Sequence, residues 1–130
     1  MNDEHDPSQR HPRAQKLIAD ELWHCADEEA PFGSDEGAEA YESYRRWRAD
    51  NPEAPLTDCI DWIGDESAYP DEFTFDSTII ATVLGQLAWE GRIDAEAKVF
   101  ARTAIERQMI GASKHRRSLL EKTLAAIDAG

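Results

Sequence analysis

The sequence predicts an all-α fold, a compact bundle of about six short-to-medium helices. Apolar residues recur at spacings of three and four along most of the chain, which is the period of a helix with one buried face. Proline, glycine and capping residues separate these stretches at short intervals. We expect residues 11–130 to form a single helical domain and residues 1–10 to form a disordered acidic tail.

The first helix is expected at about residues 12–27. Pro12 suits its first position, because the N–H that proline lacks has no helical partner there. The sequence APFG at residues 30–33 interrupts the pattern. The apolar stripe consists of Ala14, Leu17, Ile18, Leu22, Cys25 and Ala26.

The second helix is expected at about residues 35–49, with Ser34 as its N-cap. Asp35 and Glu36 fall in its first turn, where the helix dipole favours negative charge. Pro52 ends this helix, because the residue before a proline avoids the helical conformation.

The third helix is expected at about residues 55–63. Its apolar face consists of Leu56, Cys59, Ile60 and Ile63. Residues 64–75 form the longest irregular stretch of the chain. Phe73 and Phe75 alternate with polar residues there, which predicts a short extended segment near residues 72–76.

The fourth helix is expected at about residues 77–90, with Asp76 or Ser77 as its cap and Gly91 at its end. It is the most apolar segment of the chain, so we expect it to be the central helix. Its apolar residues are Ile79, Ile80, Val83, Leu84 and Leu87.

The fifth and sixth helices are expected at about residues 95–110 and 114–128, capped by Asp94 and Ser113. The inward residues of the fifth are expected to be Ala97, Phe100, Ala101, Ala104, Ile105 and Met109. Those of the sixth are expected to be Leu119, Leu120, Leu124 and Ile127.

Negative charge is concentrated in the first part of the chain, which has a formal net charge of −13. Residues 1–75 contain 20 acids and 6 bases, whereas residues 76–130 contain 7 acids and 8 bases. Three interpretations stay open: a solvated surface, a face for a basic partner, or internal pairing with the Arg and Lys residues of the last two helices. Direct binding of nucleic acid is not expected, because phosphates repel such a surface.

The most unusual segment is DEEAPFGSDEG at residues 27–37, which places acids around a Pro-Phe-Gly turn. It is interpreted as a helix–turn–helix connection, as a contact for a partner, or as a cation site with oxygen ligands. Its candidate binding residues are Asp27, Glu28, Phe32, Asp35 and Glu36.

A basic and aromatic cluster, YRRWR at residues 44–48, adds Arg45, Trp47 and Arg48 as candidate binding residues. Arginine stacked on Trp or Tyr is expected here. The arginines would pair with Glu42 or Asp35 along the helix, or bind an anionic ligand. The chain has four tryptophans, and we expect some of them to be half exposed, as interface hot spots are.

Neither cysteine belongs to a CxxC motif, and Cys25 and Cys59 lie 34 residues apart. Two buried thiols are expected, with a disulfide between the helices as the alternative. No nucleophile elbow, P-loop or HExxH motif occurs, so we expect no cofactor. Enzymatic activity stays open, with a non-enzymatic protein favoured over a hydrolase or transferase. Sparse cysteine, no secretory leader and no apolar run of about 20 residues lead us to expect a cytoplasmic protein without a membrane span.

Several short segments together resemble a known family. They are HP at 11–12, APFGSDEG at 30–37, WR at 47–48, NP at 51–52, PL at 55–56, WI at 62–63, TIIAT at 78–82, LGQL at 84–87, EGRID at 90–94 and RQ at 107–108. Over about residues 11–110 the chain is similar to the small bacterial proteins called YfeS-like. This resemblance implies no activity and no catalytic residues. The triplet of a WGR module, sometimes linked to that label, is broken here by WEGR at 89–92.

These observations predict a non-enzymatic, acidic interaction protein whose first half binds a basic or mixed-charge protein. One form of it is an immunity- or antitoxin-type inhibitor that covers the basic site of a toxin. The alternative is a small-molecule or metal-binding domain that uses the acidic segment at 27–37 and the helix around Arg45 and Arg48. A homodimer that uses exposed tryptophans is also compatible with the sequence.

Overall fold

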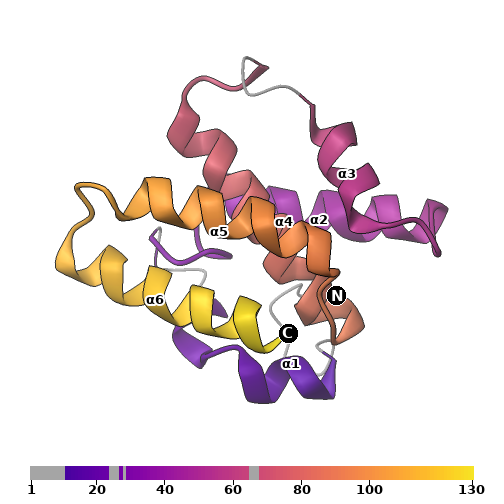
Figure 1. Cartoon of the computed structure of the whole chain (residues 1–130), viewed down its shortest axis with the longest axis horizontal. Helices are drawn as coiled ribbons and strands as arrows, with labels where there is room; N and C mark the ends of the chain where they lie inside the picture. Colours follow the sequence, from indigo (N-terminus) through magenta and orange to yellow (C-terminus); the bar gives the residue numbers. More distant parts are fainter. Residues whose placement is uncertain (1–10, 24–26, 28, 65–67) are drawn as a thin grey trace.

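The computed structural model describes residues 11–23, 27, 29–64 and 68–130 (Figure 1). Within them it contains six α-helices, one 3₁₀ helix and no strand, which confirms the all-α fold. The elements are α1 (Pro12–Leu17), η2 (Asp20–Trp23), α2 (Asp35–Asp50), α3 (Leu56–Ile63), α4 (Glu72–Glu90), α5 (Ala95–Met109) and α6 (Lys114–Ala129). The expected acidic tail, residues 1–10, lies outside the described residues.

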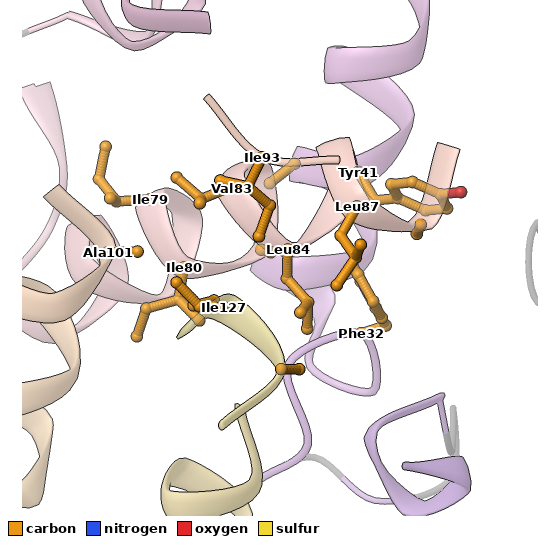
Figure 2. Packing of buried hydrophobic residues seen from close by; sticks show 14 of the residues in the cluster. Phe32, Tyr41, Ile79, Ile80, Val83, Leu84, Leu87, Ile93, Ala101 and Ile127 are labelled. Carbon is orange, nitrogen blue, oxygen red and sulfur yellow. The ribbon is translucent and has the colours of Figure 1, made fainter. Parts of the chain in front are cut away.

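Helix α4 is the central element of the fold, as the sequence predicts. Every residue from 78 to 88 is buried. A helix that is apolar around its whole circumference needs cover on all sides, and α1, α2, α3, α5 and α6 all pack against it. Figure 2 shows this packing, with Phe32 and Tyr41 near Leu87 and with Ile127 of α6 beside Ile80.

Helix α2 crosses α4 at a close approach that requires glycine. A Cβ at position 85 would lie 2.8 Å from Cδ1 of Tyr41. The Tyr41 ring is buried and packs against Phe32 at a centroid distance of 4.9 Å, so it has little room to move aside. Gly85 therefore sets how near α2 can lie to α4.

Helices α5 and α6 run side by side in opposite directions on another face of α4 (Figure 1). The buried stripe of α5 is small, with Ala97, Ala101 and Ala104 facing inward. The prediction that Phe100 faces inward is wrong, because its side chain is 47% exposed. The small residues let α5 lie close to α4. Phe100, which directly precedes Ala101, lies on a different face of α5 and points outward.

The single first helix predicted over residues 12–27 is wrong. Helix α1 ends at Leu17 and Ile18 adopts an extended conformation. The 3₁₀ helix η2 then begins at Asp20. Ile18, Leu22 and Trp23 are all buried. The change of direction lets the Trp23 ring stack on Phe32 at 4.8 Å, and burial of a large ring offsets the loss of helical hydrogen bonds.

The extended segment predicted near residues 72–76 is also wrong, because α4 begins at Glu72. The cap is Asp71, whose carboxylate accepts a hydrogen bond of 2.6 Å from the backbone N–H of Thr74. Asp76, expected as a cap, lies inside the helix and is buried against Arg107, with 3.0 Å between Nε and Oδ2. The acidic cap and this ion pair favour a helix here over the strand that the alternation suggested.

Replacement of Leu84 by Ala is expected to destabilise the protein by about 3 kcal/mol, because the buried methyl groups of Leu84 would leave a cavity. Leu84 lies in the middle of α4 and is fully buried. The matched control is Val99→Ala on α5, where the side chain is 59% exposed and a change within about 0.5 kcal/mol is expected. Urea denaturation measures both. Equal effects of the two substitutions would contradict the central position of α4.

Candidate functional site

The exposed faces of α2 and α3 carry carboxylates that have no basic partner among the described residues. The acids of residues 11–75 without an ion pair there are Asp20, Asp35, Glu36, Glu39, Asp50, Glu53, Asp58, Asp61 and Asp71. Most of them belong to α2, to α3 and to the connection between the two helices. Water is therefore their main partner.

Bases of the second half reach only the margin of this acidic region. Lys122 lies 2.7 Å from Glu21, and Arg116 lies 3.7 Å from Glu29. Arg107 approaches Glu72 at 4.0 Å but is held mainly by Asp76. Internal pairing, one of the three interpretations of the charge, thus applies to the loops before α2 and to the start of α4.

A cleft of about 390 Å³ opens beside these carboxylates, between α2, α3 and the first part of α4. We name it the α2–α3 cleft. It is lined by Glu36, Glu39, Ala40, Ser43, Tyr44, Cys59, Trp62, Ile63, Tyr69, Thr74, Thr78 and Thr82. Glu36 and Glu39 are three residues apart on α2, so they share one face of that helix. The ring of Trp62 is 60% exposed.

The electrostatic field of α2 extends into the α2–α3 cleft. Burial raises the pKa of the Tyr69 hydroxyl, and the negative charge of Glu39 raises it further. Cys59 is a free, buried thiol whose pKa burial raises to about 12, although Arg48 opposes the shift. Both groups therefore stay neutral near pH 7, and the charge of the cleft comes from its carboxylates. Cys25 lies outside the described residues.

A buried ionic network fixes the wall of the cleft. Arg48 Nε donates a hydrogen bond of 2.9 Å to Glu90 Oε2, and the Tyr44 hydroxyl donates to the same oxygen. Arg48 Nη1 donates to the carbonyl oxygens of Asn51 and Ala54, at 2.9 and 2.7 Å. Burial and the neighbouring Glu90 carboxylate raise the pKa of Tyr44. Tyr44 is thus a rigid, neutral part of the cleft.

The structure distributes the candidate residues of segment 27–37 between the surface and the core. Phe32 is fully buried against Trp23 and Tyr41. Asp35 and Glu36 lie in the first turn of α2, as predicted, and Ser34 accepts a hydrogen bond from the N–H of Gly37. Glu36 also lines the α2–α3 cleft. Glu28 lies outside the described residues.

Asp27 lies beside a histidine from a distant part of the chain. Nε2 of His115, in the first turn of α6, lies 2.8 Å from Oδ2 of Asp27 and 3.9 Å from Oε2 of Glu29. One potential ligand atom from each residue lies within 4.8 Å of the others. Spacing along the chain could not indicate this group, because 88 residues separate Asp27 from His115.

The basic cluster at 44–48 serves mainly to hold α2 in place. Trp47 and Arg48 are buried, at 9% and 7% exposure. The predicted stacking is present, because the Arg45 guanidinium lies 4.3 Å from the centre of the Trp89 ring. The predicted pairing of Arg45 or Arg48 with Glu42 or Asp35 is wrong. Arg46 pairs with Glu42, at 3.5 Å, and Arg48 pairs with Glu90.

The four tryptophans divide evenly between core and surface. Trp23 and Trp47 are buried, whereas Trp62 and Trp89 are 60% and 38% exposed. The expectation that some are half exposed is therefore confirmed. Trp62, Glu39 and Tyr69, which line the α2–α3 cleft, were not predicted as site residues from the sequence. Because Trp62 follows two positions after the buried Ile60, its exposure depends on how α3 is tilted against its neighbours.

Replacement of Arg48 by Met is expected to destabilise the protein by about 3 kcal/mol, because it leaves the Glu90 carboxylate partly buried without its main partner. Arg46→Met on the same helix is the matched control. The Arg46 side chain is 70% exposed, so a change within about 0.5 kcal/mol is expected. Guanidinium chloride denaturation compares them. A cost for Arg48→Met as small as that of the control would contradict the structural role of the pair.

Comparison of the chain with family models, with curated proteins and with solved structures gave no match. The resemblance to the YfeS-like proteins therefore stays a prediction. The function has to be argued from the residues and the geometry described above.

Proposed function

We propose that this protein is a non-enzymatic, acidic interaction protein that binds a basic segment of another protein through α2 and α3. The observation that carries the proposal is the set of exposed carboxylates on these helices that form no ion pair with a described residue, next to a cleft with an exposed tryptophan. Concentrated charge of one sign accelerates association with a partner of opposite charge and disfavours other partners. An exposed aromatic ring supplies the apolar contact that charge alone does not provide.

An immunity- or antitoxin-type inhibitor in the cytoplasm is one concrete form of this function. Toxins that act on nucleic acids or phosphates need basic active sites, and an acidic protein surface can cover such a site. The absence of a catalytic motif from the sequence is in keeping with a binding role. None of the described helices combines the length and apolar character needed to cross a membrane.

A defined basic peptide tests the proposal. We expect a 12-residue Arg- and Lys-rich peptide to bind, as measured by fluorescence anisotropy, and to bind more weakly as salt rises from low to high concentration. The triple variant E39Q/D58N/D61N should raise Kd about tenfold, since each surface charge contributes ~0.5 kcal/mol. These three carboxylates are exposed on α2 and α3.

The control removes the same amount of charge from helices other than α2 and α3. E96Q/E106Q/E121Q replaces three exposed acids of α5 and α6. It should change Kd by less than about twofold at physiological salt, where charges more than ~8 Å away are screened. An equal loss in both triple variants would show attraction by net charge alone, and no binding at low salt would refute the proposal.

A second candidate function, a divalent-cation site, is favoured by one observation: His115 lies with Asp27 and Glu29 in a group of potential ligands. A nitrogen and two carboxylate oxygens suit Zn²⁺. Two features oppose a cation there, namely Arg116 at 3.7 Å from Glu29 and the positive end of the α6 dipole. This candidate therefore ranks second.

Zinc titration with thermal melting tests the second candidate. If Asp27, Glu29 and His115 hold the ion, Zn²⁺ at 100 times Kd should stabilise the protein by about 2.7 kcal/mol. The variant H115A should abolish that gain. D35N, which alters an exposed acid of the neighbouring turn, should retain it. An unchanged melting temperature in wild type, or a gain that survives in H115A, would eliminate the site.

A further inference from the structure

We infer that the α2–α3 cleft is a pocket for a single arginine side chain of the basic partner, with Glu36 and Glu39 binding the guanidinium and Trp62 stacking on it. This inference rests on the proposed function and names the chemistry of its central contact. It is carried by the arginines that stack on two of the three other exposed aromatic rings, by carboxylates without an ion pair among the described residues, and by the shape and neutrality of the cleft floor.

The fold itself pairs arginine with exposed aromatic rings elsewhere. The Arg45 guanidinium lies 4.3 Å from the centre of the Trp89 ring, and that of Arg116 lies 4.5 Å from the Phe73 ring. Trp89 and Phe73 are 38% and 41% exposed. Trp62 is more exposed, at 60%, and within the described part of the chain it has no such cation above it. A guanidinium from a partner would complete the same arrangement.

Within the described part of the chain, the carboxylates that line the cleft have no positively charged partner. An arginine stacked on Trp62 would supply one. Glu36 and Glu39 line the cleft, and neither forms an ion pair with a described residue. Glu39 and Tyr69 both line the cleft, and the negative charge of Glu39 adds to burial in raising the pKa of the Tyr69 hydroxyl. A guanidinium is planar and presents a fork of donors, so one face can lie on an indole while its edge binds carboxylates. An ammonium group offers only a point charge.

The floor of the cleft suits the apolar stem of the side chain. The Thr78 and Thr82 hydroxyls donate to carbonyl oxygens of their own helix, at 3.0 and 2.8 Å. The Tyr44 hydroxyl is engaged by Glu90, and Cys59 keeps its proton. These groups offer little to a charged head, so the guanidinium would lie against Glu36, Glu39 and Trp62, and only the methylenes would contact the floor.

The size of the cleft indicates one side chain with its flanking backbone. Its volume of about 390 Å³ falls near the lower end of the range of ligand pockets, ~300–1,000 Å³. Asp58 and Asp61 are exposed on α3, which gives further basic residues of the same partner a place to bind. The pocket would then fix the register of a basic segment that the remaining charges attract.

The test compares two peptides of equal length and charge, one with arginine and one with lysine at every basic position. Wild-type protein should bind the arginine peptide about fivefold more tightly at physiological salt. W62A should reduce this preference to less than about twofold while leaving binding of the lysine peptide nearly unchanged. E36Q/E39Q should weaken both peptides and also remove the preference.

The control variants act on an exposed ring and on exposed acids outside the cleft. F100A removes a ring of α5 that is 47% exposed, and D58N/D61N removes two acids of α3. Both should keep the arginine preference. If basic peptides bind but wild type does not prefer arginine, or if W62A keeps the preference, the pocket is refuted and the acidic interaction surface stands. If neither peptide binds, both the arginine pocket and the acidic interaction surface are refuted.

Discussion

The Arg48–Glu90 ion pair joins the C-terminal part of α2 to the end of α4, and much of the fold depends on it. The same arginine donates to the carbonyl oxygens of Asn51 and Ala54, which places the chain for α3. Glu90 also receives the hydroxyl of Tyr44. Because Arg48 is the main partner of a partly buried carboxylate, its loss is costly. The pair therefore holds α2, α3 and α4 in one arrangement, and the α2–α3 cleft lies between them.

Positive and negative charges are concentrated on different helices of the fold. Helices α5 and α6 contain seven of the 14 bases, and several of these reach acids at the edge of the first half, as Lys122 reaches Glu21. Among the described residues, the carboxylates of α2 and α3 form no ion pair except Glu42, which pairs with Arg46 at 3.5 Å. Negative charge therefore persists where α2 and α3 meet solvent, beside the exposed ring of Trp62. Together these features favour a binding surface over a merely solvated one.

Local signals in the sequence were sufficient to predict most helix boundaries. They were insufficient where a contact between separate elements sets the boundary. Ser34 and Ser113 cap α2 and α6 as expected, because capping depends on residues within one turn. The break after Leu17 depends on burying Trp23 against Phe32, which is a contact between separate elements. The early start of α4 depends on Asp71 as the cap, although Phe73 and Phe75 alternate like strand residues.

Composition and periodicity by themselves determined the all-α class, the central position of α4 and the acidity of the first half, since each reflects neighbouring residues or simple counts. Only the tertiary structure decided that Phe32, Trp47 and Arg48 belong to the interior. It also brought His115 to Asp27 and made Trp62 line the same cleft as Glu36 and Glu39. The physical reason is that these relations depend on the angles and distances between helices, which a single helical period does not specify.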